Sequence, residues 1–188
     1  LGFGDVLEGS WNSVADMPLK GLRNIGDTCY LNCVAQILMR TPAIVEWMIK
    51  HSTSCPCGDS CVLCALYDTY RGMFIGERVC GSPALAERSH FVAACFGERI
   101  QHDIFEFLEA FLWRVHYTEV DAGRSRFWGG VQAQTPYASH VDRIFGFVME
   151  KRGECMRCHG GVRSWFIAER ALRLLPSAGA GGPMTVPE

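Results

Sequence analysis

The sequence has little that suits a membrane or a nucleic acid. No apolar run approaches the roughly 18 residues that a membrane-spanning helix needs. The 18 basic and 20 acidic residues leave a net charge of −2, so there is no basic field. The N-terminal residues do not resemble a secretory signal. With 48% hydrophobic and 20% charged residues in 188, the composition is that of one folded domain. We expect neither a membrane nor a nucleic acid as partner.

Cysteine, in contrast, is abundant, with ten in the chain. In a sequence without a secretory signal, close pairs such as Cys61–Cys64 and Cys155–Cys158 favour metal ligands or reactive thiols over a disulfide framework. We therefore expect reduced thiols and an intracellular protein, in the cytoplasm or the nucleus. Because the chain begins with Leu1 and not with Met, we also expect it to be a fragment.

The spacing of apolar residues changes along the chain from helical to strand-like. It predicts helices from Cys29 to a break at Pro42, then over 43–50, 62–75, 84–96 and 103–116, with a loop over 51–61. Strands are predicted over 144–150 and 162–168. Residues 1–18 are expected to be a loosely packed lead-in and 176–188 a flexible Gly/Pro-rich tail. Helices followed by strands predict one α+β domain over 19–175.

The segment 21–38, GLRNIGDTCYLNCVAQIL, places Cys29 near the start of a helix that Thr28 can cap. At a helix N-terminus, unpaired N–H groups and the helix dipole favour a thiolate. Asn24, on the preceding loop, could turn its amide toward an oxyanion that forms next to this thiol. The alternative is that Cys29 is a buried core cysteine, and Cys33, one turn later, suits that interpretation.

The same segment resembles the cysteine box of the ubiquitin-specific proteases, Gly-Leu-x-Asn-x-Gly-x-Thr-Cys-Tyr-x-Asn followed by a Gln and an apolar residue. The matching residues are Gly21, Leu22, Asn24, Gly26, Thr28, Cys29, Tyr30, Asn32 and Gln36. The resemblance implies a papain-like cysteine protease fold, a helical thumb followed by the start of the antiparallel β fingers and palm. It also implies that Cys29 is the nucleophile and that Asn24 helps to form the oxyanion hole.

Residues 101–108, QHDIFEFL, resemble the glutamine box of the same family, Gln-Gln-Asp-Ala-His-Glu-Phe-Leu. The agreeing residues are Gln101, Asp103, Glu106, Phe107 and Leu108, and the departures are His102, Ile104 and Phe105. In the family the Asp of this box contacts the extended C-terminal tail of ubiquitin, so the resemblance implies that Asp103, with Gln101 nearby, binds substrate. The alternative is that Asp103 only caps its helix, because it also has the capping-box spacing to Glu106.

Residues 144–158, IFGFVMEKRGECMRC, resemble the strand and turn that open the fingers of this family. There a CxxC pair holds zinc together with a second pair further along the chain. The resemblance implies that Cys155 and Cys158 form half of a zinc site, and we expect their sulfurs on one side of a hairpin turn. A structural zinc needs four ligands, and no second pair follows in this sequence.

A second candidate zinc site is the cluster of Cys55, Cys57, Cys61 and Cys64, which has four thiols within ten residues. Some ubiquitin-specific proteases carry a similar HS…C…C…C segment, which HSTSCPCGDSCVLC resembles. The alternative, a set of partly buried free thiols, is slightly favoured. We interpret the histidines at 51, 90, 102, 116 and 140 as surface or helix-face residues.

The sequence shows no counterpart of the family's late box, which carries the catalytic His and the Asp or Asn that orients it. A thiol protease needs such a base, and His140 precedes the CxxC strand and lacks the flanking glycine. We predict a thiol-dependent deubiquitinase that needs no catalytic cofactor and whose base lies outside this chain, which alone is inactive. Two alternatives stay open: an inactive ubiquitin-binding or scaffold pseudo-protease, and a redox or zinc-binding regulatory protein.

Overall fold

The structure is a computed structural model that describes residues 20–76, 82–98, 100–127, 139–155, 157 and 163–170, with backbone alone over 121–127. The predicted lead-in over 1–18 and the predicted tail over 176–188 lie outside the described residues, and so does Cys158. Within the described ranges, no helix has the length and apolar character that a membrane crossing requires.

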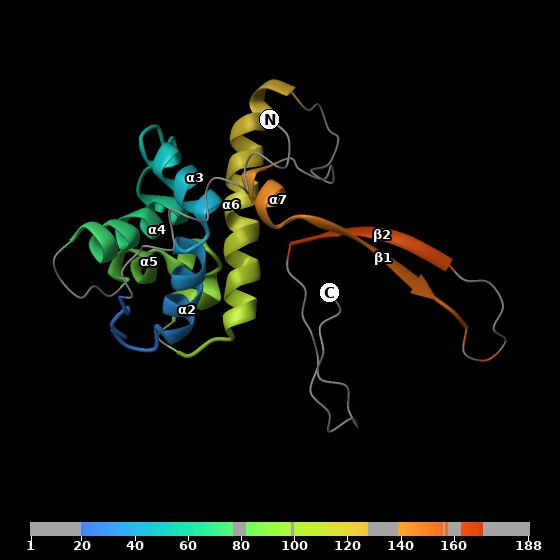
Figure 1. Cartoon of the computed structure of the whole chain (residues 1–188), viewed down its shortest axis with the longest axis horizontal. Helices are drawn as coiled ribbons and strands as arrows, with labels where there is room; N and C mark the ends of the chain where they lie inside the picture. The colour runs from blue at the N-terminus through green and yellow to red at the C-terminus, as the bar shows by residue number, and fades with distance from the viewer. Residues whose placement is uncertain are drawn as a thin grey trace.

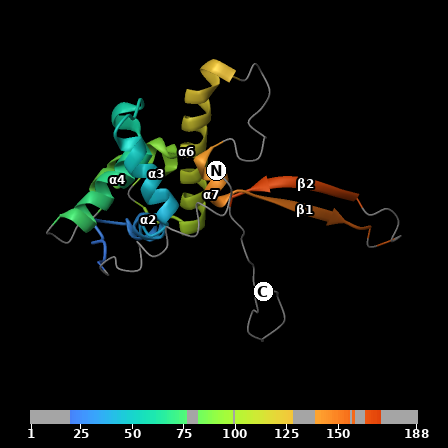
Figure 2. The same ribbon diagram turned by 45° about the horizontal axis from the view of Figure 1, so that its top comes forward.

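Helices come first along the chain and one hairpin comes last, so the predicted α+β class is confirmed. The helices are α2 (Cys29–Met39), α3 (Pro42–Ser52), α4 (Val62–Tyr70), α5 (Pro83–Glu87), α6 (Ile104–Phe127) and α7 (His140–Phe145). The strands are β1 (Phe147–Gly153) and β2 (Arg163–Glu169). In Figures 1 and 2, α6 lies between the group α2–α5 and the α7–hairpin part.

Several short helical turns complete the helical part. A 3₁₀ turn, η1 (Gly58–Ser60), precedes α4, and a π-helical turn, η2 (Arg71–Ile75), extends it. The helix predicted over 84–96 is instead three short pieces, namely α5, η3 (Ser89–Phe91) and η4 (Ala94–Gly97). The Ser89 hydroxyl explains part of this break, because it lies 2.8 Å from the Ala86 carbonyl and 2.6 Å from the Phe96 carbonyl and holds the chain in a compact turn.

The core forms around α2, which packs against α3, α4 and α6. Its inward face consists of residues at helical spacing that are almost fully buried: Leu31, Val34, Ala35, Leu38 and Met39. Burying one such large side chain contributes about 1.5–3 kcal/mol. The opposite face keeps Cys29, Cys33 and Ile37 exposed, so one helix supplies both the core and an open surface.

Helix α6 begins as its sequence predicts and ends later. The Asp103 carboxylate accepts a hydrogen bond from the Glu106 N–H at 3.0 Å, which is an N-cap contact. The buried face carries Phe107, Phe111, Leu112 and Val115, as the apolar stripe predicts. The helix continues to Phe127 and does not end near His116.

Helix α7 was not predicted, and its residues include the start of the strand expected from Ile144. Ser139 caps α7 by accepting a hydrogen bond from the Asp142 N–H at 3.1 Å. Gly146 lets the chain leave the helix, because a Cβ there would overlap the Asp142 carbonyl oxygen. Strand β1 therefore starts at Phe147, three residues later than the expected strand.

A buried ionic network joins the end of β2 to the helices. Arg170 contacts the Asp142 carboxylate through Nε at 2.7 Å and a terminal nitrogen at 2.6 Å, and its guanidinium lies 4.2 Å from the centre of the Trp113 ring. On the other side of Asp142, His116 Nδ1 lies 3.2 Å from the carboxylate and 2.8 Å from the Ser139 hydroxyl. Because this network is almost fully buried, it fixes the root of the hairpin to α6 and α7.

Away from its root, the hairpin leaves the helical part and extends into solvent (Figures 1 and 2). The strands are antiparallel, with Phe147 opposite Glu169 and Gly153 opposite Arg163. Trp165 and Phe166, on opposite faces, are 48% and 71% exposed. Neither face of this two-stranded sheet is therefore covered by the described part of the chain.

These burial differences give a testable ranking of two phenylalanines. Phe107→Ala removes a fully buried ring and is expected to lower the free energy of unfolding by about 3–5 kcal/mol. Phe166→Ala, the matched control, removes a mostly exposed ring and is expected to cost under about 0.5 kcal/mol. Urea denaturation followed by circular dichroism measures both, and equal losses would contradict the position of the core.

Candidate active site and metal group

Cys29 is the first residue of α2 and its thiol is exposed. Thr28 precedes it as the N-cap residue, but no side chain caps the first turn of the helix. The backbone N–H groups at this end thus remain available for an anion beside the thiol. The start of α2 at Cys29 is where the sequence predicted it.

The loop before Cys29 is held by the side chain of Asn24. Its Oδ1 atom accepts hydrogen bonds from Gly26 N–H at 3.1 Å, from Thr28 N–H at 3.2 Å and from the Thr28 hydroxyl at 3.0 Å. Gly26 and Asp27 have φ of +109° and +50°, left-handed values that Gly and Asp tolerate better than most residues. The result is a tight turn that ends at Thr28.

These bonds determine which way the Asn24 amide faces. Backbone N–H groups can only donate, so the atom that faces them must be the oxygen, and the NH₂ group takes the other direction. Asn24 is exposed, and its nitrogen makes no hydrogen bond within the described ranges. It is therefore a free donor on the loop that leads to Cys29, which is the chemistry that an oxyanion hole requires.

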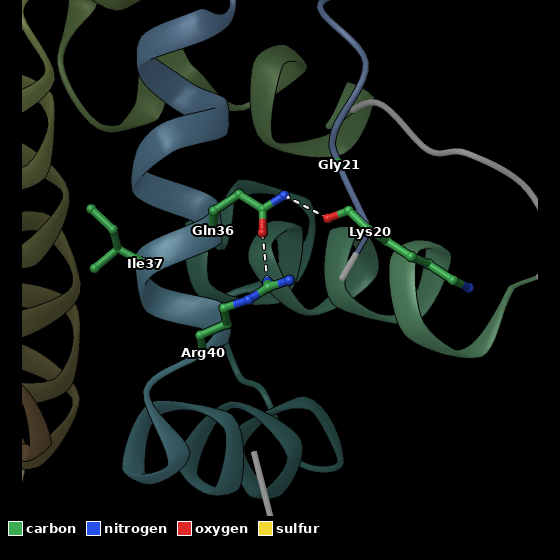
Figure 3. A pocket seen from close by; sticks show the side chains of 5 residues that line it. All are labelled: Lys20, Gly21, Gln36, Ile37 and Arg40. Carbon is green, nitrogen blue, oxygen red and sulfur yellow. Dashed lines mark hydrogen bonds between the residues drawn. The ribbon is translucent and has the colours of Figure 1, made fainter. Parts of the chain in front are cut away.

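Two further residues of the cysteine box hold this loop against α2. Asn32 donates to the Arg23 carbonyl at 3.3 Å and accepts from the Ser82 hydroxyl at 2.7 Å. One turn later, Gln36 donates to the Lys20 carbonyl at 3.1 Å (Figure 3). Because both contacts reach backbone carbonyls, they fix the path of residues 20–23 alongside the helix. Their role here is positioning.

The outer end of this contact forms a shallow hollow of about 530 Å³, lined by Lys20, Gly21, Gln36, Ile37 and Arg40 (Figure 3). Arg40 donates to the Gln36 side-chain oxygen at 2.6 Å, and its guanidinium lies 5.5 Å from the centre of the Phe74 ring. The Gln36 amide is therefore engaged at both ends, which supports its positioning role.

The glutamine box lies close to the cysteine box through an aromatic cluster. Tyr30, next to Cys29, is buried, and its ring centre lies 5.2 Å from those of both Phe107 and His102. Burial, with smaller effects from Cys95, Cys29 and Asp27, raises the pKa of Tyr30, so its hydroxyl stays protonated at neutral pH. The cluster links the N-termini of α2 and α6. Gln101 and Asp103 are exposed beside it.

The departures of the glutamine box have structural explanations. His102 packs edge-on against Tyr30 and Phe96, with ring centres 5.2 and 4.8 Å away, and its Nε2 atom is buried without a hydrogen bond in the described structure. It is a half-buried residue that packs into an aromatic cluster. Ile104 is exposed and Phe105 half-buried on the first turn of α6.

No histidine of the described ranges hydrogen-bonds the Cys29 thiol. His116 lies in the buried network at the hairpin root. His140 bonds the Glu119 carboxylate and stacks on Trp47, with ring centres 5.0 Å apart. His90 contacts the ring of Phe91. These residues do not supply a base to Cys29.

A metal-binding group forms where α3 meets α4. The ligand atoms of His51, Cys55, Cys61 and Cys64 all lie within 4.8 Å of one another, a His-Cys₃ set that can bind a metal ion such as zinc. His51 Nε2 is 3.2 Å from the Cys61 sulfur. Three of the four cysteines of the predicted cluster are thus brought together. The fourth ligand is His51, which was interpreted as a surface or helix-face residue, and Cys57 lies outside the set.

Backbone N–H groups also point at these sulfurs. Cys55 accepts from the Cys57 N–H at 3.4 Å, and Cys61 accepts from the Cys64 N–H at 3.5 Å and so caps α4. Burial acts to raise the pKa of Cys55, but the hydrogen bonds that its sulfur accepts lower it on balance. Burial raises the pKa of Cys61 and Cys64, with hydrogen bonds and charge from Cys55 adding to it. A metal ion would displace these protons.

The fourth thiol of the cluster, Cys57, is half-buried and touches the group without joining it. Burial, with the neighbouring Cys55 and Cys61 sulfurs, raises the pKa of Cys57 to about 11. Burial lowers the pKa of His51, so its ring stays neutral near pH 7, as a ligand must be. A cavity of about 130 Å³ adjoins the group and is lined by Trp47, His51, Cys57, Cys61 and Glu119, among others.

The second predicted site, Cys155 and Cys158, stays a prediction. Cys155 follows β1, is exposed and is not in a disulfide, but Cys158 lies outside the described residues. The eight cysteines in the described ranges form no disulfide with one another. Among them only the α3–α4 cluster gathers three or more His, Cys, Asp or Glu ligands within the described part of the chain.

Known proteins resemble this chain in sequence, and solved structures resemble it in fold. Mouse "Ubiquitin carboxyl-terminal hydrolase 17-like protein A" is 28% identical over 153 residues, which is 80% of this chain and 27% of that protein. "Ubiquitin carboxyl-terminal hydrolase 22-B" of Xenopus laevis is 27% identical over 151 residues, 76% of this chain and 27% of its own length. The chain spans about a quarter of the length of these relatives.

Among solved structures, the fold resembles that in "Structure of the SAGA Ubp8/Sgf11/Sus1/Sgf73 DUB module bound to ubiquitin aldehyde". The TM-score is 0.56 at 19% identity, and the match covers 80% of this chain and 34% of the other. This likeness establishes the fold, an incomplete papain-like α+β arrangement. Residues 20–175 also match the sequence profile described as "Ubiquitin carboxyl-terminal hydrolase". The chain therefore belongs to the ubiquitin carboxyl-terminal hydrolase family.

Proposed function

We propose that this chain carries the nucleophile of a thiol-dependent deubiquitinase, an enzyme that cleaves the isopeptide bond after the C-terminal glycine of ubiquitin. The observation that supports this best is the exposed Cys29 thiol at an uncapped helix N-terminus, preceded by the loop of Asn24. Family membership gives the reaction class, and ubiquitin and its conjugates are the partners that follow from it.

The chemistry follows from these groups. The Cys29 thiolate attacks the isopeptide carbonyl, and the oxyanion that forms is stabilised by N–H groups of the first turn of α2 and by the Asn24 amide. The lysine amine leaves with a proton, and water then hydrolyses the thioester. Asn24 suits this role because its oxygen is already occupied within the loop, which leaves its NH₂ group as the donor.

Asp103 and Gln101 are proposed to hold the extended tail of ubiquitin. Both are exposed, and the aromatic cluster around Tyr30 fixes the N-terminus of α6 relative to Cys29. One carboxylate can serve both functions, because capping occupies Asp103 Oδ1 with the Glu106 N–H and a carboxylate has further acceptor sites.

The general base is proposed to lie in the part of the relatives' length that this chain does not span. None of the histidines in the described ranges hydrogen-bonds the Cys29 thiol. An intracellular compartment, cytoplasm or nucleus, is part of the proposal and is supported by cysteines grouped as a candidate metal site. A ubiquitin-binding pseudo-protease is the competing function, and loss or retention of turnover in the full-length protein decides between them.

The nucleophile can be tested in the protein encoded by the full reading frame. Cys29→Ala is expected to reduce hydrolysis of a fluorogenic ubiquitin substrate by at least about 10⁴-fold. Cys33→Ala is the matched control, because Cys33 is exposed on the same helix one turn later, and it should leave the rate nearly unchanged. Asn24→Ala should lower kcat by about 10²–10³-fold. A full-length protein without turnover would favour the pseudo-protease.

The isolated 188-residue chain is expected to show no appreciable turnover of the same substrate. Without a positioned side-chain base, general base catalysis is lost, which alone removes a factor of about 10²–10⁴. A small alkylating reagent should still label Cys29, which peptide mass spectrometry detects. Turnover by this chain that Cys29→Ala abolishes would show that one of its own histidines acts as the base.

The His-Cys₃ group supports a second proposal, a structural zinc ion between α3 and α4. His51 comes from α3 and Cys64 from α4, with Cys55 and Cys61 on the segment between them. An ion bound there would cross-link the two helices. Its contribution would be to stability and not to the reaction. The Cys155–Cys158 half-site remains a separate proposal, to be completed by ligands outside this chain.

Metal analysis of the purified chain is expected to find one zinc per chain at neutral pH. Cys64→Ser should lose it, whereas Cys95→Ser, which changes an exposed thiol outside the group, should retain it. Affinity should fall as the pH is lowered, since protons compete for the Cys61 and Cys64 sulfurs, whose pKa is raised. Equal zinc content in both variants would place the metal elsewhere.

A further inference from the structure

The thiol cluster holds one donor more than a tetrahedral ion needs. His51, Cys55, Cys61 and Cys64 make up the four-ligand set. Cys57 lies beside this set: its backbone N–H donates to the Cys55 sulfur at 3.4 Å, and Cys57 and the ligand residue Cys61 line the same cavity. An ion bound by the set leaves Cys57 as an uncoordinated thiol beside Cys61.

The local backbone favours Cys61 as the partner of Cys57. The two residues flank the 3₁₀ turn η1, which Gly58 enters with φ +57°. The Ser60 hydroxyl donates to the Cys57 carbonyl at 3.0 Å, and the Cys61 N–H donates to the Gly58 carbonyl at 3.3 Å. This hydrogen-bonded turn folds the five-residue segment that has the two cysteines at its ends. Cys55 is a poorer partner, because only Pro56 separates it from Cys57 and so short a ring strains a disulfide.

A small reagent can reach this pair. Cys57 and Cys61 both line the cavity of about 130 Å³ that adjoins the group. A water molecule needs about 10–15 Å³ of such space, so hydrogen peroxide fits. The described lining includes apolar side chains such as Trp47, Leu63 and Val115, and it contains no thiol besides Cys57 and Cys61.

We propose that Cys57 and Cys61 are a redox-sensitive pair, which a two-electron oxidant such as hydrogen peroxide converts to a disulfide with release of the zinc ion. This inference rests on the zinc site proposed above. Cys61 is one of the four ligand residues, and its sulfur contacts His51 and accepts the Cys64 N–H. Without it the ion keeps three ligands, and its affinity falls.

The reaction balances in two steps. The Cys61 thiolate attacks one oxygen of hydrogen peroxide, the O–O bond breaks, and a sulfenic acid forms with release of hydroxide. The Cys57 thiol then attacks the Cys61 sulfur, an S–S bond forms, and the sulfenic oxygen leaves with the thiol proton as water. Two thiol sulfurs lose two electrons in all, and peroxide oxygen gains them.

The test oxidises the zinc-loaded 188-residue chain with hydrogen peroxide and follows released zinc with a chromophoric chelator. Zinc is measured before oxidant is added. We expect one zinc released for each disulfide formed and reversal by a thiol reductant in the presence of zinc. Cleavage before Asp59, which lies between the two cysteines, should leave two fragments joined by the disulfide, with Cys55 and Cys64 alkylated.

Cys57→Ser is expected to bind zinc normally, because Cys57 lies outside the ligand set, and to release it severalfold more slowly at equal peroxide. Cys95→Ser, the matched control, should behave like the unaltered chain. Equal release from Cys57→Ser, or a disulfide that excludes Cys57, would overturn the proposal. A chain without zinc before oxidation contradicts the zinc site alone, and fragment mapping then still decides whether the Cys57–Cys61 disulfide forms.

Discussion

The position of the candidate nucleophile depends on how the inward face of α2 is buried. Leu31, Val34 and Leu38 are almost fully enclosed by α3, α4 and α6, and each step along an α-helix turns by about 100°. A shift of one residue would bury Cys29 and expose Tyr30. Packing of the core thus sets the direction of the thiol, although Cys29 itself contributes little to the core. A substitution far along α2 can therefore act on the site without touching it.

The loop before α2 follows the same constraint through polar contacts. Asn32 and Gln36 donate hydrogen bonds to backbone carbonyls within residues 20–23. The Asn24 side chain accepts hydrogen bonds from its own turn and so closes it. Each of these side-chain amides makes hydrogen bonds that hold the loop, so their presence in the cysteine box has a physical reason beyond catalysis. Only the Asn24 nitrogen is left over, and that difference separates the residue proposed for chemistry from those that position it.

Local signals predicted much of this structure. Helix α2 begins at Cys29 and α6 is capped by Asp103 because the cap and the apolar stripe are written within a few residues. Helix α7 is not predicted from the sequence, because six residues are too few to show a helical period. Its Asp142 is held by Arg170, which follows strand β2 and is far away in the sequence. His51 was missed as a ligand for a similar reason: its proximity to Cys61 and Cys64 arises from the packing of α3 on α4, although it opens the HS…C…C…C segment. The predicted start of the first strand is wrong because Ile144 and Phe145 belong to α7.

Within the described part of the chain, the hairpin contacts the helices mainly at its root (Figure 1). Its root is fixed by the Arg170–Asp142 pair, but each strand has a single neighbour in the described structure and both faces carry exposed aromatic or aliphatic side chains. Two strands alone are marginally stable in water, so opening of the distal end costs little free energy, and its amide protons exchange with solvent far sooner than those of α2. Binding of the hairpin to another surface carries the entropy cost of ordering its strands, which weakens binding per unit of buried area. The same freedom lets the hairpin adapt to surfaces of different curvature.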